Sequence, residues 1–149
     1  MSPSPQRRTA EALVAAFNNM DVDKIISYRS PDCTRQFIPS SINAPQNNAA
    51  YAKTLHQLRA IFYNFSLKVT DILEDKDARR VCMWLTARAD TAAGKYVNEY
   101  VWLLDFDGTG RKITTSKEYS DTIMARDFFP KLQAAMKAQQ ASTNGKTHK

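Results

Sequence analysis

The chain contains few of the residues that build phosphate loops, metal sites or disulfides. Its 149 residues include four glycines, two cysteines and two histidines. The glycines are isolated in turns and in the tail, so no glycine-rich phosphate loop is expected. Cys33 and Cys82 lie in apolar or strand-like segments without motif spacing, which favours buried free thiols and a reducing, cytoplasmic location. We therefore expect neither a metal site nor a bound cofactor.

Long apolar runs and dense basic patches are also missing. No segment is apolar enough over its length to cross a bilayer, and no signal peptide is recognisable, so we expect no membrane partner. The net charge is +6, but the basic residues are dispersed along the chain. Nucleic-acid binding requires a concentrated basic patch, commonly with exposed aromatic rings. The surplus charge therefore indicates solubility rather than a nucleic-acid partner.

The size and the composition of the chain are those of one globular domain. Hydrophobic residues make up 43% of the chain and charged residues 24%, and the length suffices for a single core. Helical spacing of apolar residues predicts helices over residues 9–20, 22–28, 47–62 and 123–139. Alternating polarity predicts strands over residues 33–38, 65–74, 79–90, 95–107 and 112–121.

The order of these elements predicts an α+β fold. The last four strands are direct neighbours in the sequence and should pair antiparallel as a meander. A curved antiparallel sheet would then wrap around the N-terminal helices. We expect a single domain over residues 7–139, with flexible termini at residues 1–6 and 140–149.

Residues 95–121 form the most informative segment, because they combine a hairpin signal with polar residues among aromatic ones. Two strand-like runs flank Asp107-Gly108-Thr109-Gly110, which is typical of a hairpin turn. A turn centred on Thr109 would pair Tyr100 with Glu118, and Trp102 with Ser116. A slip of one residue would move Glu118 to the opposite face. The expected register puts a carboxylate, an amide and two phenols on one surface, as the floor of a polar pocket: Tyr96, Asn98, Tyr100, Glu118 and Ser120.

Several short strings resemble those of a known family. They are YRSPDC at 28–33, PSSI at 39–42, PQNNAAY at 45–51, NEY at 98–100 and KEYSD at 117–121. In this order they resemble the SnoaL-like branch of the nuclear-transport-factor-2-like superfamily, and in particular small fungal isomerases and cyclases of meroterpenoid and indole-alkaloid biosynthesis. The resemblance spans roughly residues 7–121. It implies a cone-shaped SnoaL-like barrel, a homodimer formed through the outer sheet face, and cofactor-free acid–base chemistry on an enclosed small-molecule natural product.

The resemblance also assigns catalytic candidates. In this family an acidic residue on the last strand and an arginine near the first strand matter for catalysis, which correspond here to Glu118 and Arg35, with Arg29 as the rival arginine. Tyr96 and Tyr100 match tyrosines expected around the ligand. The chain lacks the paired pocket histidines of scytalone dehydratases, so that dehydration is not expected. The resemblance favours a semipinacolase-type rearrangement.

The candidates also have structural interpretations. Glu118 could be a solvated strand residue and Arg35 an outward charge on an edge strand, while Arg29 could pair with helix-terminal carbonyls. Among the remaining candidates for substrate contact, Asn98 is favoured as a polar pocket residue, because a buried amide needs partners that a ligand could supply. Trp102 has the alternative of a core residue, His56 that of a structural histidine, and Asp121 that of the cap of the final helix. Because a fold does not fix a function, a non-catalytic binding or adaptor module and a cofactor-free oxygenase stay open as alternatives.

Overall fold

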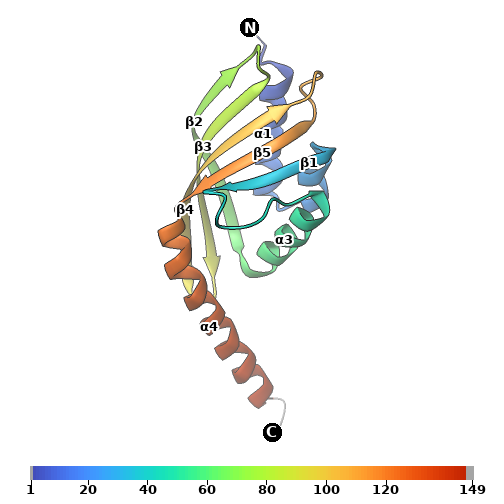
Figure 1. Cartoon of the computed structure of the whole chain (residues 1–149). Coiled ribbons are helices and arrows are strands. Elements are labelled where there is room, and N and C mark those ends of the chain that lie inside the picture. The colour runs from blue at the N-terminus through green and yellow to red at the C-terminus, as the bar shows by residue number, and fades with distance from the viewer. Residues whose placement is uncertain (1, 147–149) are drawn as a thin grey trace.

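The computed structural model describes residues 2–146 and contains four helices and five strands within that range. Figure 1 shows their arrangement. In chain order they are α1 (Pro5–Asn18), α2 (Val22–Ser27), β1 (Arg29–Ile38), α3 (Asn48–Ile61), β2 (Tyr63–Asp75), β3 (Arg80–Thr91), β4 (Gly94–Phe106), β5 (Ile113–Ser120) and α4 (Thr122–Lys146). The α+β class is confirmed, and the elements follow the expected order.

Both terminal helices extend beyond the expected domain limits. Ser4 caps α1 by accepting a hydrogen bond from the Arg7 backbone N–H, so the helix begins at Pro5 and already buries Gln6. At the other end α4 continues to Lys146 in spite of the internal Pro130. Residues 5–6 and 140–146, which we expected outside the domain, are therefore helical. Residues 1 and 147–149 lie outside the described residues.

The five strands form one curved sheet in the order β1-β5-β4-β3-β2. Strands β2 to β5 pair antiparallel, which confirms the meander. The sheet differs from the expected antiparallel one in a single pair, because β1 lies parallel to β5. No hairpin joins these two strands: after β1 the chain crosses through α3 to the opposite edge and returns through the meander. The sheet does not close on itself, and β1 and β2 are its edges.

The pairing of β4 with β5 differs by two residues from the expected register. Trp102 pairs with Glu118, and Tyr100 with Ser120. The hairpin loop spans residues 107–112, and one further residue, Thr114, is bulged between the pairs Asp105–Thr115 and Phe106–Ile113. Because strand side chains alternate with a period of two, a shift of two residues leaves every side chain on its expected face. Glu118 therefore still lies on the inner face.

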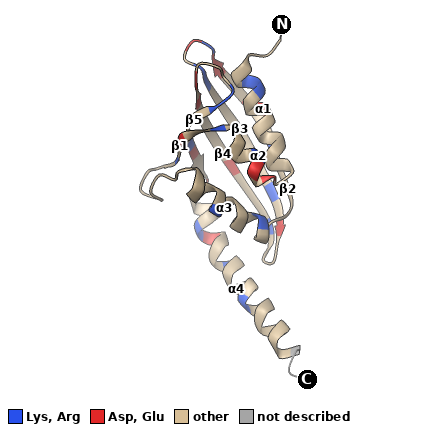
Figure 2. Cartoon of the chain, turned by 90° about the vertical axis from the view of Figure 1, so that its right-hand side faces the viewer, with Lys and Arg blue, Asp and Glu red and all other residues tan. Residues whose placement is uncertain are grey.

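The helices α1, α2 and α3 lie on one side of the sheet, as Figures 1 and 2 show. Their apolar sides pack on the inner sheet face, where the core includes Leu13, Phe17, Ile25, Leu55, Met83, Leu85, Leu104 and Ile113. The basic residues are spread over several elements with acidic residues between them (Figure 2). Within residues 2–146 no helix is long and apolar enough to span a membrane.

Candidate active site

A cavity of about 640 Å³ lies between the inner sheet face, α3 and the start of α4. Its volume is typical of sites for small organic molecules. Apolar and aromatic side chains form most of its wall: Phe17, Met20, Phe37, Ile42, Leu55, Leu58, Phe62, Phe65, Leu67 and Phe129. Polar groups from β1, β4 and β5 converge on the floor of the cavity, and a few others, such as Thr54 and Arg126, come from the helices that cover it. Such a wall suits a largely hydrocarbon ligand with a reactive polar group facing the floor.

The central feature of the floor is a buried ion pair between Arg35 and Glu118. Arg35 Nη2 donates to Glu118 Oε2, and the two residues are 8% and 7% exposed. Trp102, which faces Glu118 across the strands, donates from Nε1 to Glu118 Oε1 at 2.8 Å. Burial lowers the pKa of the Arg35 guanidinium, but the Glu118 charge and hydrogen bond outweigh burial and raise the pKa above its usual value. Arg35 is therefore a fixed cation.

The orientation of Arg35 is set from three sides. Its guanidinium lies over the rings of Phe37 and Tyr51, with 4.2 Å and 4.4 Å to the centroids. Arg35 Nη1 donates to Gln46 Oε1 at 2.9 Å, and the backbones of these two residues exchange hydrogen bonds of 2.8 Å. Gln46 also donates to Thr54 on α3 at 2.9 Å. The loop before α3 therefore holds the arginine against Glu118.

Tyr96, Asn98 and Tyr100 stand in sequence on the inner face of β4. The hydroxyls of Tyr96 and Tyr100 are 2.5 Å apart, and Asn98 Nδ2 donates to Tyr96 Oη at 3.1 Å. Burial, followed by Tyr96 and Glu118, raises the pKa of Tyr100 well above its usual value. Burial also raises the pKa of Tyr96. Both phenols therefore keep their protons at neutral pH and act as hydrogen-bond donors rather than as bases.

Arg29 lies beneath the floor and does not line the large cavity. Its Nε donates to Asn48 Oδ1 at 2.9 Å and its Nη1 to Ser116 Oγ at 3.1 Å. Its buried Nη2 has no hydrogen-bond partner among the described residues. Arg29 also lines a small chamber of about 20 Å³. Burial lowers the pKa of Arg29. Of the two candidate arginines, the structure therefore places Arg35 at the cavity and Arg29 behind it.

Two expected substrate contacts lie outside the cavity. His56 is exposed on α3, on the side that faces away from the cavity lining. The helical period puts Tyr51, Leu55 and Leu58 on the cavity side, which turns His56 outward. Asp121 accepts a hydrogen bond from the Met124 backbone N–H at 3.0 Å and thus caps α4. Neither residue lines the large cavity, and the structural alternative for Asp121, the cap of the final helix, is confirmed.

Several cavity residues were not predicted from the sequence. Tyr51 and Thr54 on α3 and the first turns of α4, including Thr122 and Arg126, line the cavity. Tyr51 lies on the apolar side of its helix with Leu55, and this side packs on the core and lines the cavity as well. No local signal indicates that α4 returns over the sheet, because this depends on where β5 ends in the fold.

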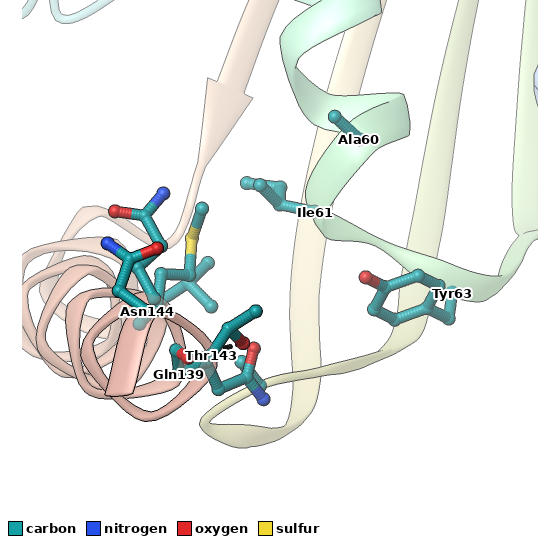
Figure 3. Close-up of a pocket in the computed structure, with 10 residues that line it drawn as sticks. Ala60, Ile61, Tyr63, Gln139, Thr143 and Asn144 are labelled. Carbon is teal, nitrogen blue, oxygen red and sulfur yellow. Dashed lines mark hydrogen bonds between the residues drawn. The ribbon is translucent and has the colours of Figure 1, made fainter. Parts of the chain in front are cut away.

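A second hollow lies away from these polar groups, between the far half of α4 and the junction of α3 with β2 (Figure 3). Its volume is about 490 Å³, and Ala60, Ile61 and Tyr63 face Gln139 and Asn144 across it. None of its ten lining residues carries a charge at neutral pH. Within residues 2–146, no group of three or more His, Cys, Asp or Glu residues is placed to hold a metal ion. Of these two hollows, only the large cavity is lined by charged side chains.

Comparison with known proteins agrees with the fold. Residues 10–115 match the model of the SnoaL-like domain family, and the chain belongs to this family. The solved structure of BvnE pinacolase from Penicillium brevicompactum is 27% identical, with a TM-score of 0.83 over 89% of this chain and 96% of that one.

Two curated relatives are also similar along most of their length. Austinoid biosynthesis cluster protein H from Aspergillus calidoustus is 29% identical over 93% of this chain and 99% of the relative. A protein of Pestalotiopsis fici named monooxygenase ptaG is 26% identical over 88% of this chain and 92% of the relative. The relatives thus include fungal biosynthesis proteins with more than one kind of named activity.

Proposed function

We propose that this protein is an enzyme that isomerises or cyclises an oxidised intermediate of fungal secondary metabolism by acid–base chemistry, without a cofactor. The observation that carries the proposal is the buried Arg35–Glu118 pair beside the Tyr100 hydroxyl, at the floor of an apolar cavity of about 640 Å³. The likeness to a pinacolase and to an austinoid cluster protein supports the same class of reaction.

Glu118 is the proton acceptor in this proposal. Its two oxygens each accept one hydrogen bond, from Arg35 and from Trp102, and each keeps a further lone pair. A substrate hydroxyl that reaches the carboxylate can therefore pass a proton to it. Arg35 and the Tyr100 hydroxyl provide a fixed cation and a fixed donor for an oxygen that gains negative charge, as in an oxyanion hole.

A semipinacol rearrangement uses these groups without any change of oxidation state. Glu118 takes the proton of a carbinol hydroxyl, the carbinol C–O becomes C=O, and one substituent migrates with its bonding electrons to the adjacent carbon. That carbon must be electron-poor, as in an imine, whose nitrogen receives the displaced electron pair and then the proton that Glu118 took. The return of this proton restores the enzyme, and Tyr100 keeps its own proton as a hydrogen-bond donor. The cavity wall then selects which substituent migrates, because it fixes the bound conformation.

The variant Glu118→Gln tests this role. It keeps the shape of the side chain and an oxygen that accepts hydrogen bonds, but it does not accept the proton. We expect a folded protein whose conversion rate falls by about 10²- to 10⁴-fold. The assay uses the purified protein with the oxidised intermediates that accumulate when the gene is inactivated in its host, and mass spectrometry of the products. Full activity of the variant would remove Glu118 from the mechanism.

A cofactor-free oxygenase is the second candidate, because one relative carries the name monooxygenase. The two candidate reactions differ in whether the product gains an oxygen atom. An isomerase or cyclase gives a product of unchanged mass with or without oxygen, whereas a monooxygenase adds one oxygen atom and stops under anaerobic conditions. Conversion under argon to a product of the same mass supports the isomerase, and an oxygen-dependent gain of mass supports the alternative.

We also propose that the protein is a homodimer formed through the outer face of the sheet. Trp84, Val101 and Tyr119 lie in register across β3, β4 and β5 on this face. Trp84 is 38% exposed and Tyr119 is 53% exposed. A row of partly exposed apolar side chains on a sheet face is typical of a contact surface.

A further inference from the structure

The Asn98 amide has an orientation that its neighbours determine. Its side chain is 3% exposed on the inner face of β4. The atom Oδ1 accepts hydrogen bonds from the backbone N–H groups of Glu99, at 2.8 Å, and of Asp121, at 3.2 Å. Two N–H donors that meet at one atom require an acceptor there, so this atom is the oxygen. The amide nitrogen must therefore face Tyr96.

The direction of the next hydrogen bond follows from this orientation. Asn98 donates to Tyr96 Oη, and the Tyr96 proton needs an acceptor of its own. Within residues 2–146 the structure gives the Tyr96 hydroxyl only one further partner, the hydroxyl of Tyr100. The opposite direction would leave the Tyr96 proton unpaired in a buried position beside the rings of Phe128 and Phe129. The chain of donors therefore runs from Asn98 through Tyr96 to Tyr100.

The chain of donors ends at the cavity. Tyr100 accepts from Tyr96, so its own proton is available to a ligand at the floor, next to Arg35 and Glu118. Because each donor in a chain polarises the next, the Tyr100 hydroxyl becomes a stronger donor than an isolated phenol.

We propose that Asn98 is a positioning residue, which sets the direction of the tyrosine hydrogen bonds so that Tyr100 donates to the substrate oxygen that gains negative charge. The proposal rests on the proposed function, in that it assigns such an oxygen to the floor of the cavity. Asn98 does not touch the substrate in this account. It acts through Tyr96, and its two backbone bonds anchor it beside the start of α4.

The variant Asn98→Asp reverses the chain of donors with little change of volume. One carboxylate oxygen still accepts from Glu99 and Asp121, so the anchor beside α4 is kept. The other oxygen accepts from Tyr96 instead of donating to it, Tyr96 then accepts from Tyr100, and the Tyr100 proton turns away from the cavity. We expect turnover to fall about 10²-fold, which is typical for the loss of one donor to a developing oxyanion. Turnover equal to that of the wild type would overturn the proposal.

The pH dependence of turnover distinguishes a reversed direction of the hydrogen bonds from a general structural effect of the substitution. Protonation of the introduced carboxyl group restores a donor toward Tyr96, so the activity of Asn98→Asp relative to the wild type should rise as the pH falls. The variant Asn98→Ala has no group to protonate, and its relative activity should not rise. A constant ratio between Asn98→Asp and the wild type at every pH would overturn the proposal.

Binding of 4-nitrophenol tests the proposal without any turnover, because its absorbance distinguishes the phenolate from the phenol. Arg35 and Tyr100 should stabilise the bound phenolate, and Asn98→Asp should weaken its binding. The new carboxylate also repels an anion, so the same substitution is made in the Tyr96→Phe variant, where the charge is equal but the chain of donors is broken. We expect a several-fold larger loss of phenolate affinity in the wild-type background.

Equal losses in the two backgrounds would overturn the assignment of Asn98. This result does not depend on the reaction of the natural substrate, so it is distinguishable from a failure of the proposed function. A protein that binds the phenolate as expected, but converts no oxidised intermediate, would contradict the isomerase proposal and leave the role of Asn98 intact.

Discussion

Two buried arginines, Arg35 and Arg29, differ in what their removal would leave behind. Arg35 is paired with the buried Glu118 carboxylate. Arg29 is hydrogen-bonded only to the neutral acceptors of Asn48 and Ser116 among the described residues. Loss of one member of a buried ion pair leaves an uncompensated charge, whereas loss of an arginine bound to neutral groups does not.

We therefore expect Arg35→Met to lower the free energy of unfolding by about 3–5 kcal/mol. Arg29→Met should cost less, about 1–3 kcal/mol, because only hydrogen bonds to neutral groups are lost. Urea denaturation of the two variants and the wild type measures both values. A larger loss for Arg29→Met than for Arg35→Met would contradict the charge assignment of the floor.

Tyr100 should make stability depend on pH in the alkaline range. Burial and then the neighbouring Tyr96 and Glu118 raise its pKa in the folded state well above the usual value, whereas the unfolded chain ionises it at about pH 10. Above that pH the folded state holds more protons than the unfolded state, so the free energy of unfolding falls as the pH rises. Below it this contribution is fully present.

The comparison of the wild type with Tyr100→Phe isolates this effect from that of other groups. Urea denaturation at several pH values above about 9 should give a steeper loss of stability for the wild type, since Tyr100 ionises in its unfolded state only. Identical slopes for the two proteins would show that the Tyr100 phenol is not held in its neutral form by the fold.

Gly110 connects the β4–β5 hairpin to the start of α1 by direct contact. Its φ is +69°, and a Cβ built there would lie 2.8–2.9 Å from atoms of Gln6 and Pro5. Its carbonyl accepts a hydrogen bond of 2.8 Å from Thr9 Oγ1. The close contact and the left-handed backbone both require glycine at this position.

Gly110→Ala should therefore lower the free energy of unfolding by roughly 1–3 kcal/mol. Gly108→Ala is the matched control in the same loop, since no atom lies within 4 Å of its added Cβ. Thermal denaturation of both variants gives the comparison. Equal melting temperatures for Gly110→Ala and Gly108→Ala would mean that the hairpin leaves room for a Cβ beside α1, which contradicts the close contact.

The same hairpin shows which parts of the fold are predictable from the sequence. Alternation along β4 and β5 correctly assigned Tyr96, Asn98, Tyr100 and Glu118 to the inner face, because a register error of two residues does not change the face. The register itself was wrong, because the hairpin has a six-residue loop, whose Gly110 contacts α1, and a bulge at Thr114, and the turn residues alone indicate neither. The parallel pairing of β1 and the return of α4 over the cavity likewise depend on contacts between distant segments.

The candidate site likewise has residues that the sequence predicts and contacts that it does not. Residue type and strand alternation were sufficient to select Glu118 and the two tyrosines for the floor. The partners of Glu118 could not be predicted from spacing, because Arg35 comes from a distant part of the sequence and Trp102 from the corrected register. The resemblance to the family supplied the choice of Arg35, and the structure places it at the cavity.

The outer sheet face should govern the oligomeric state of the whole molecule. Trp84→Glu puts a charge beside Val101 and Tyr119 and should prevent formation of the proposed dimer, because a desolvated charge without a partner opposes association. Tyr63→Glu is the control, since Tyr63 is 60% exposed but lines the hollow beside α4. Analytical ultracentrifugation measures the mass of each protein, and a wild-type monomer would contradict the dimer proposal.

In the proposed reaction, a substrate oxygen binds at the floor of the large cavity, between Arg35, Glu118 and Tyr100. A crystal structure of the Glu118→Gln variant with the accumulated intermediate tests this placement. We expect the hydrocarbon part of the ligand against the aromatic wall and one of its oxygens within hydrogen-bond distance of Arg35 and Tyr100. A ligand bound in the hollow beside α4, or with only apolar groups at the floor, would contradict it.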